Sequence, residues 1–408
     1  MKVYIETLGC KVNFSDSSHI ATLLRNNGHS IAMKPEEAEI FIINSCSVTH
    51  RAERECRQIA RRYYNLNHNI QIIITGCSIR SESFLSRLQD IPFVKIAPLN
   101  DIPKILGLSG EKVDNPYFNR SRPFIKIQEG CNRFCAYCIV PFLRGAPISI
   151  ERDRILNQIE YALINGYQEI VLVGTHLMLY EDPHSKTDIF QLLSDIERLN
   201  YNFRVRLSSI EPFGLKEENI KRLSEYRKLC QHFHIPLQSG SGKVLRDMNR
   251  DYDISRYISV LSSIKKYMPE ATIGTDIIVG FPTETEQDFA ETERFVLNEP
   301  IDYMHIFRYS RREGTAAFSM KGVSNSTEIK NRSDRLLKIS FEKRYNMIKR
   351  NLGKVMDIII TDNNINSTGL THNYIQVIIQ DTSLRKGKMY RARLLSFNSN
   401  NKVNGEIL

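Results

Sequence analysis

The 408-residue sequence lacks any run of about 20 apolar residues, the length that a helix needs to cross a bilayer. Its first residues, MKVYIETLGC, enter a strand-like pattern without the apolar segment of a signal peptide. We therefore expect a cytoplasmic protein without a membrane partner. A composition of 41% hydrophobic and 25% charged residues is typical of a folded chain, and the length suits two or three domains.

The sequence also lacks the paired motifs of a zinc site. Such sites usually show two C-x2-C pairs or a mixture of Cys and His, and neither flanks the dense cysteine run EGCNRFCAYCIVP, which contains Cys131, Cys135 and Cys138. A disulfide framework is not expected in the cytoplasm, where cysteines more often serve metal binding or catalysis. Ordinary buried thiols, or a zinc site completed from elsewhere in the chain, remain the alternatives.

Three thiolates at C-x3-C-x2-C spacing leave one iron of a cubic 4Fe–4S cluster without a cysteine ligand. That iron can bind S-adenosylmethionine (SAM), whose sulfonium bond an electron from the cluster cleaves. Cys131, Cys135 and Cys138 are thus predicted to be both metal ligands and catalytic residues of a radical enzyme. The segment resembles that of radical SAM enzymes, in which the position of Tyr137 lies beside the adenine of the cofactor.

A second set of cysteines follows strand-like runs near the N-terminus. The runs KVYIET, EIFIIN, IQIIIT and VKIAP alternate with helical patterns over 14–27, 49–64, 81–89 and 101–106, which predicts a parallel sheet. Cys10, Cys46 and Cys77 each follow one of the first three runs, and the carboxyl ends of parallel strands meet at one edge. These residues therefore form a candidate second site with three thiolates. Cys56 and Cys230 belong to helical patterns and are interpreted as core or surface thiols.

The middle of the chain repeats a strand–helix unit. Strand-like runs lie near 124–128, 169–173, 203–207, 233–237, 272–279 and 304–309, and helical patterns such as 152–165, 188–199, 254–267 and 286–297 separate most of them. Six such units predict a partial (β/α)6 barrel with its active site at the carboxyl ends of the strands. His232 and His234 flank a strand residue and are interpreted as packed or hydrogen-bonded rather than metal-binding.

The C-terminal part of the sequence differs from the preceding parts in its strand-rich pattern and its positive charge. The runs VMDIIIT, NYIQVII and KMYRARLLSF predict a small β-barrel, and residues 107–122 read as a linker. The expected α/β protein thus has domains 1–110, 120–350 and 351–408. Residues 321–408 hold 16 Lys and Arg against 7 Asp and Glu, nearly the whole net charge of +10, which favours a phosphate-binding surface over a merely solvated face. Candidate RNA contacts are Lys386, Lys388, Arg391 and Arg393, with Tyr374 and Tyr390 nearby.

Motifs along nearly the whole length resemble one family, the methylthiotransferases. TLGCKVN, INSCSVT and ITGCS resemble its three N-terminal cysteine segments, GCNRFCAYCIVP its radical segment and GLTHNYIQV its C-terminal TRAM module; VGTH, RLSSIEP, HIPLQSGS, MNRDYD, GTDIIVGFPTET and YSRREGTAAF match as well. The resemblance implies an auxiliary 4Fe–4S cluster on Cys10, Cys46 and Cys77 beside the radical cluster. It also implies that Gly174, Ser209 and Glu211, at strand ends, contact the methionine or ribose of SAM.

The implied reaction replaces an unactivated C–H bond with a methylthio group. One SAM methylates a sulfur carried on the auxiliary cluster, and a second is cleaved to the radical that opens the substrate. The implied partners are tRNA, a low-potential electron donor such as flavodoxin or ferredoxin, and a sulfur donor. The family commonly has a Ser-Arg pair where this chain has Ser149-Ile150, and Arg152 is a candidate replacement for that arginine.

The tripeptide Lys11-Val12-Asn13 points to one branch of the family. It resembles the branch that acts on N6-threonylcarbamoyladenosine (t6A) beside the tRNA anticodon. The isopentenyladenosine branch usually has Gly-Cys-Gln-Met-Asn here, and the branch that modifies an aspartate of a small-subunit ribosomal protein has Gly-Cys-Pro-Lys-Asn. Those two activities, and an iron–sulfur RNA-binding protein without catalysis, are the alternative functions.

Overall fold

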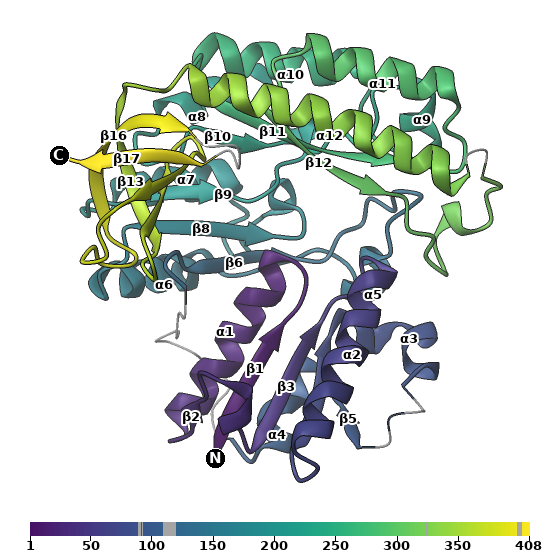
Figure 1. Cartoon of the computed structure of the whole chain (residues 1–408), viewed down its shortest axis with the longest axis vertical. Coiled ribbons are helices and arrows are strands. Elements are labelled where there is room, and N and C mark those ends of the chain that lie inside the picture. The colour runs from purple at the N-terminus through teal and green to yellow at the C-terminus, as the bar shows by residue number, and fades with distance from the viewer. Residues whose placement is uncertain (89–90, 92, 109–119, 323–324, 398–401) are drawn as a thin grey trace.

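The computed structural model describes residues 1–88, 91, 93–108, 120–322, 325–397 and 402–408 (Figure 1). Most of the predicted linker 107–122 lies outside the described residues. The expected α/β architecture is confirmed, with an N-terminal parallel sheet, a central set of strands surrounded by helices, and a C-terminal closed barrel. In the described part of the chain, no helix has both the length and the apolar character that crossing a membrane requires.

The N-terminal sheet has the parallel order β2-β1-β3-β4-β5. Its strands are β1 (Lys2–Thr7), β2 (Ser30–Ile31), β3 (Ile40–Ser45), β4 (Gln71–Gly76) and β5 (Val94–Ile96). Helices α1 (Lys11–Asn26) and α4 (Ile102–Ile105) cover one face, and α2 (His50–Leu66) and α3 (Glu82–Ser86) cover the other. Strand β3 is central and buried throughout because both of its faces pack against helices.

The central strands form two sheets, β7-β6-β8-β9 and β10-β11-β12. Isolated β-bridges connect the two sheets; they pair Val205 with Leu229 and Ser209 with His234. The strands are β6 (Phe124–Glu129), β7 (Ile148–Ser149), β8 (Glu169–Gly174), β9 (Arg204–Leu207), β10 (His232–His234), β11 (Thr272–Val279) and β12 (Tyr303–Arg308). The six predicted strands are all present, with the short antiparallel β7 in addition. The sheets therefore make an open, partial barrel.

Helices surround this partial barrel, and the largest apolar core lies between strands and helices. They are α5 (Val140–Arg144), α6 (Arg152–Ile164), α7 (Ile189–Arg198), α8 (Glu217–Glu225), α9 (Gly242–Asp247), α10 (Ile254–Tyr267), α11 (Glu286–Asn298) and α12 (Ser326–Lys349). The 24-residue α12 carries much of the basic surplus, since residues 321–350 hold 9 Lys and Arg against 3 Asp and Glu. The surplus therefore belongs largely to the central part rather than to the C-terminal barrel.

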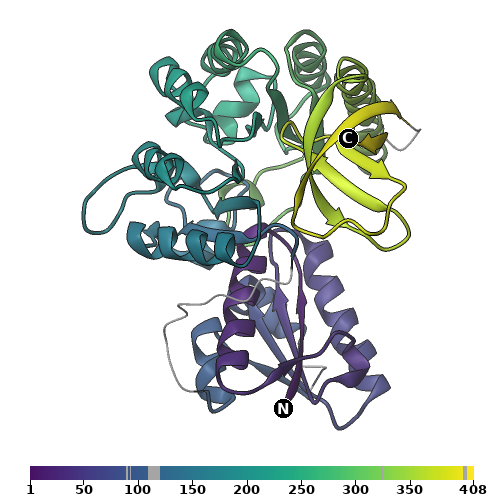
Figure 2. The same ribbon diagram turned by 90° about the vertical axis from the view of Figure 1, so that its left-hand side faces the viewer.

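The C-terminal barrel closes in the order β13-β14-β15-β17-β16. Its strands are β13 (Val355–Asp362), β14 (Ser367–Thr371), β15 (Gln376–Ile379), β16 (Met389–Phe397) and β17 (Val403–Ile407). Figure 2 shows this barrel (yellow) beside the central strands, with the N-terminal sheet below both.

A buried ion network joins the C-terminal barrel to the central strands. Glu169 on β8 accepts hydrogen bonds from Arg204 Nε at 2.6 Å, from Arg206 Nε at 2.9 Å and from Arg122 at 3.1 Å. Burial alone raises the pKa of Glu169, but the three guanidinium groups overcome it and hold the pKa below its ordinary value. Arg204 and Arg206 also donate to four backbone carbonyls of the C-terminal barrel, those of Asp357, Leu370, Thr371 and His372, at 2.6–3.0 Å.

Candidate active site between two cysteine triads

Cys131, Cys135 and Cys138 lie in the loop that follows β6, at the carboxyl end of the first barrel strand, as predicted. We call them the radical triad. Backbone hydrogen bonds fold the loop: Cys138 N–H donates to the Cys135 carbonyl at 2.9 Å, and Cys131 N–H donates to the Gly145 carbonyl at 3.0 Å. All three thiols are partly exposed. Gly130 begins the turn at φ 81°, and a Cβ there would lie 2.1 Å from the Ala146 carbonyl oxygen, so only glycine fits.

The radical triad lines a cavity of about 340 Å3, a volume within the range of small-molecule sites. The rest of the wall includes Tyr137, Glu211, Arg133, His176 and Arg250. Buried nitrogen atoms of Arg133 (Nε), His176 (Nδ1) and Arg250 (Nε) have no hydrogen-bond partner among the described residues. Two arginine donors and an imidazole nitrogen beside three thiols fit a cofactor with a carboxylate and an amine that binds next to a metal cluster.

Arg250 connects the predicted residues of this cavity. Its guanidinium pairs with Glu211, donates to the Cys135 sulfur at 3.1 Å and reaches the Tyr137 hydroxyl at 3.4 Å. Burial raises the pKa of Glu211, although the arginine opposes that shift. Sequence reasoning missed Arg250, yet it lies in the quoted motif MNRDYD, and a cation inside a family motif was the available signal.

Cys10, Cys46 and Cys77 follow the adjacent strands β1, β3 and β4 and meet at one edge of the N-terminal sheet, as predicted. We call them the auxiliary triad. The Asn13 Oδ1 atom lies 3.9 Å from the Cys10 sulfur and 3.8 Å from the Cys77 sulfur. Its amide nitrogen donates to the carbonyls of Leu8 and Ser45, at 2.8 and 2.9 Å, so Asn13 fastens the three strand ends together.

Gly9 makes room for Cys46 in the auxiliary triad. At φ 94°, a Cβ on Gly9 would lie 2.4 Å from the Cys46 Cβ and 2.6 Å from its sulfur. Burial raises the pKa of Cys46 to about 12 and raises that of Cys77 above its ordinary value. A metal that binds these sulfurs must therefore displace protons from thiols that hold them firmly.

Arg144, at the end of α5, bridges the two halves of the site. It donates to the Cys77 sulfur at 3.2 Å, to Asn13, to Asp16 at 3.3 Å and to Glu129 at 2.5 Å. Burial lowers the pKa of Arg144, but Cys77, Asp16 and Glu129 more than offset that effect and raise it. A permanent cation beside the auxiliary triad suits thiolate ligands, which carry negative charge.

The two triads adjoin across α5. Cys77 packs in one apolar cluster with Ile139, the residue after Cys138, and with Leu143. A second cavity of about 230 Å3 lies beside them; its wall contains Tyr137 and Cys138 from the radical segment and Val48 and Thr49 from the segment after Cys46. A molecule in this cavity therefore contacts segments of both triads.

Arg312, in the loop after β12, joins the N-terminal part of the chain to the carboxyl ends of the barrel strands. This buried arginine pairs with the buried Glu53 of α2 and donates to the Ser47 hydroxyl at 2.8 Å. It also lies 2.9 Å from the His50 ring nitrogen. Because Ser47 follows Cys46 directly, the ion pair fixes the auxiliary triad relative to the barrel.

The thiols of the two triads are not spaced as ligands of one zinc ion are. Thiolates on one tetrahedral zinc lie about 3.8 Å apart, given Zn–S bonds of about 2.3 Å. Among the described residues, the group whose possible ligand atoms all lie within 4.8 Å of one another is His234, Asp276 and His305, and neither cysteine triad meets that spacing.

The other candidates are placed as follows. Gly174 ends β8 directly before two residues of the larger cavity, Thr175 and His176, while Ser209 is exposed two residues before Glu211. Their contacts to a cofactor remain predictions. Arg152 donates to Asp195 and to Asp153, both at 2.7 Å, and belongs to the wall of neither cavity described above. Its role as a replacement for the family arginine remains a prediction.

Cys56 and Cys230 are fully buried, in agreement with the core interpretation. Cys230 does not end a helix, however, because α8 stops at Glu225 and Cys230 lies in the connection to β10.

The basic candidates of the C-terminal barrel are mainly exposed. Lys386 lies in the turn before β16, and Arg391 and Arg393 alternate outward along that strand. Lys388 is half-buried, and its amine lies against Gly166 of the central part. Tyr374 does not stand on the RNA surface suggested above, because its ring stacks on His232 at 4.2 Å and lies below Arg206.

Comparison with known proteins agrees with this geometry. Residues 125–296 match the model of the radical SAM superfamily, and residues 2–94 match uncharacterized protein family UPF0004. The threonylcarbamoyladenosine tRNA methylthiotransferase MtaB of Bacillus subtilis is 32% identical over 96% of this chain and 93% of its own length. A tRNA-2-methylthio-N(6)-dimethylallyladenosine synthase of Dictyoglomus thermophilum is also 32% identical, over 96% of both chains.

Solved structures share the fold. The radical SAM methyltransferase TsrM of Kitasatospora setae superposes with a TM-score of 0.54 at 12% identity, over 78% of this chain and 77% of its own. Given the full-length similarity to curated relatives and the two cysteine triads that meet across α5, this chain belongs to the radical SAM methylthiotransferase family.

Proposed function

We propose that the protein adds a methylthio group to C2 of t6A in tRNA, next to the anticodon, with two 4Fe–4S clusters and SAM. Cys131, Cys135 and Cys138 hold the radical cluster, and the auxiliary triad holds the second. The main observation in favour of the proposal is that the two triads adjoin at α5, beside a cavity whose wall contains residues from the segments of both triads. An electron donor such as flavodoxin or ferredoxin and a sulfur donor complete the reaction.

When bound, the clusters and SAM supply the radical chemistry, the methyl group and the transferred sulfur. The chain positions them. Arg250 neutralises Glu211 and would balance the charge of the Cys135 thiolate once it holds the cluster, and Tyr137 belongs to the walls of both cavities. Arg144 balances the charge of the auxiliary triad, and the buried Arg312–Glu53 pair holds that triad over the barrel mouth. Such fixed positions matter for a radical reaction because the reacting atoms of cofactor and substrate must be held close together in the correct orientation.

The t6A branch is supported by Lys11-Val12-Asn13 and by relatives with that activity in their names, including one from Aquifex aeolicus that is 33% identical over 92% of this chain. Relatives named for dimethylallyladenosine match at similar identity, so that substrate is the main competitor. The ribosomal-protein reaction and a non-catalytic RNA-binding role are further alternatives.

Mass spectrometry of tRNA nucleosides tests the proposal. A deletion strain should accumulate t6A and lose its 2-methylthio derivative, and expression of this chain should restore the derivative. Restoration of 2-methylthio-isopentenyladenosine instead would move the protein to the other tRNA branch. An unchanged nucleoside profile together with loss of the ribosomal aspartate modification would contradict a tRNA substrate.

We also propose three functional units. Residues 1–110 form the methylthiotransferase domain with the auxiliary cluster, residues 120–350 form the radical SAM barrel, and residues 351–408 form the TRAM module that binds tRNA. The closed barrel with exposed Lys386, Arg391 and Arg393 supports the last assignment.

Substitution of Lys386, Arg391 and Arg393 by glutamine should weaken tRNA binding and flatten its salt dependence. Each lost phosphate contact lowers the slope of log affinity against log salt by about 0.7 to 0.9, so the triple variant should lose about 2 to 3. Binding titrations at several salt concentrations measure the slope.

A matched control for this variant removes the same charge from α12. Lys330, Lys338 and Lys349 are exposed there. A larger loss in the α12 variant than in the β16 variant would place the RNA footprint on the helix and contradict the assignment of residues 351–408.

A further inference from the structure

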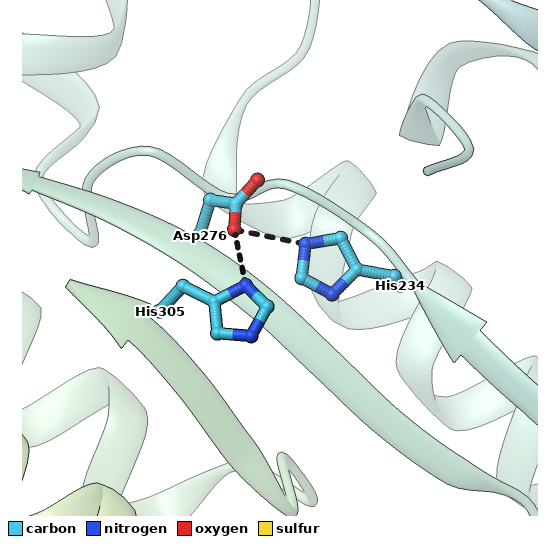
Figure 3. A group of neighbouring side chains, drawn as sticks. All are labelled: His234, Asp276 and His305. Carbon is cyan, nitrogen blue, oxygen red and sulfur yellow. Dashed lines mark hydrogen bonds and ion pairs between the residues drawn. The ribbon is translucent and has the colours of Figure 1, made fainter. Parts of the chain in front are cut away.

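Three polar side chains, one from each of three neighbouring strands, form a cluster inside the barrel that contains no cysteine. His234 on β10, Asp276 on β11 and His305 on β12 point toward one another, and one carboxylate oxygen is bonded to both neighbouring rings (Figure 3). One oxygen of Asp276, Oδ1, lies 2.8 Å from His234 Nε2 and 3.2 Å from His305 Nδ1. The imidazole rings outweigh the effect of burial and lower the pKa of Asp276 to about 2, so the carboxylate is ionised.

The group is anchored on one side and open on the other. The His234 side chain is 9% exposed, and its second nitrogen lies 3.3 Å from the Tyr303 hydroxyl. The His305 side chain is 55% exposed. Among the described residues, neither His305 Nε2 nor Asp276 Oδ2 has a hydrogen-bond partner. Both atoms are therefore available to a ligand.

Lys11 brings a cation to the same place. It begins α1 directly after Cys10 of the auxiliary triad, and its positive charge is attracted by the negative charge of Asp276 and repelled by the positive charge of Arg206. The Lys11 side chain is only partly exposed, and among the described residues it has no ion-pair partner within 4.0 Å. A largely desolvated ammonium favours an anionic partner.

The group borders the cavity that contacts both triads. Asp276 is part of the wall of the 230 Å3 cavity together with Tyr137, Cys138 and Val48. Aromatic and aliphatic side chains such as Phe307, Tyr309 and Ile278 supply most of the remaining wall, which suits a flat purine. An adenine whose C2 faces the triads also presents N6, because C2 and N6 flank N1 on the same edge of the ring. A substituent on N6 of a purine bound in this orientation can contact Asp276, which is part of the same wall.

We propose that Lys11, Asp276 and His305 form the subsite for the threonylcarbamoyl substituent and select this substrate over adenosines with an apolar or absent N6 group. The inference rests on the proposed function. The substituent carries a carboxylate, a hydroxyl and urea N–H groups. Lys11 pairs with the carboxylate, while Asp276 Oδ2 and His305 Nε2 accept from the donors.

The same three side chains are close enough for a metal ion, since their ligand atoms lie within 4.8 Å of one another. Two observations favour the organic ligand. Both histidines already bond the same carboxylate oxygen, and the positive charge of Lys11, which interacts with that of Asp276, disfavours a metal cation there.

Binding of two anticodon stem-loops that differ only in t6A or plain adenosine at the target position tests the subsite. Wild-type reconstituted protein should bind the t6A loop more tightly. Lys11→Met and His305→Phe should each weaken t6A binding roughly tenfold to a hundredfold, as expected for a lost charge-assisted hydrogen bond, and change binding of the plain loop by less than about twofold. Lys11→Arg should keep most of the preference.

The controls distinguish this inference from the proposed function. Lys338→Met, an equal charge change on exposed α12, should leave the preference unchanged. Iron content is measured for each variant, and His305→Phe keeps the test valid if Lys11→Met disturbs the neighbouring cysteine. A wild-type protein without preference for t6A refutes the substrate itself. If the wild-type protein prefers t6A and both variants retain that preference, only the subsite is refuted. The subsite is also refuted if the wild-type protein binds one equivalent of zinc and His305→Phe abolishes that binding.

Discussion

Replacement of Cys131, Cys135 and Cys138 by alanine is expected to abolish 5′-deoxyadenosine formation. The three thiols line one cavity with Arg250 and Tyr137, and no other cysteine contributes to that wall as described. Without them the chain has no cluster beside the SAM site, and the reductive cleavage has no electron source. Iron should fall from about eight to about four per chain after anaerobic reconstitution. Chromatography of reaction products and iron analysis provide the two measurements.

The matched control for the radical triad is Cys56→Ala. Cys56 is buried on α2 and packs in the same apolar cluster as Cys46, but unlike the triad cysteines it does not follow a strand. This variant should retain about eight irons and form 5′-deoxyadenosine. Loss of half of its iron would show that Cys56 is a ligand and that the assignment of the triads is wrong.

Replacement of Cys10, Cys46 and Cys77 by alanine is expected to separate the two halves of the reaction. Reductive cleavage of SAM should persist to some degree, because the radical triad and Arg250 are intact, while methylthiolated tRNA should become undetectable. The expected reason is loss of the sulfur-bearing cluster. Parallel assays of 5′-deoxyadenosine and of the modified nucleoside measure both steps.

Two results would oppose this separation. Full product formation by the auxiliary variant would remove the second cluster from the mechanism. Complete loss of SAM cleavage would mean that the triads depend on each other structurally, which the packing of Cys77 on Ile139 makes a specific alternative. Comparison of the iron content with that of the radical variant distinguishes these outcomes.

The sequence was sufficient where the signal was local. Strand runs such as EIFIIN and GTDIIVGF have the apolar pattern of buried parallel strands, and a cysteine directly after a strand must lie at the sheet edge. Both triads therefore followed from spacing and order. The same reasoning missed α12, whose apolar residues are sparse among charges, and β17, a short strand that pairs with β15 and β16.

The remaining parts of the site depend on contacts between distant segments. Arg144 meets Asn13, and Arg312 meets Glu53, across more than 130 and 250 residues respectively. The local sequence pattern cannot predict such a pair, because an arginine in a buried ion pair and an arginine on the surface can have the same kinds of neighbours in the sequence. Tyr374 is a similar case: an aromatic residue in a basic module suggested RNA stacking, but the ring packs on His232 of the barrel.

The network around Glu169 limits how the C-terminal module can be studied. Deletion of residues 351–408 would remove the four carbonyl oxygens that accept from Arg204 and Arg206. Three guanidinium groups would then share one buried carboxylate, and the uncompensated charge would destabilise the remaining chain. The module is thus part of the barrel's own electrostatic balance, and a truncated enzyme would lose activity for reasons unrelated to RNA.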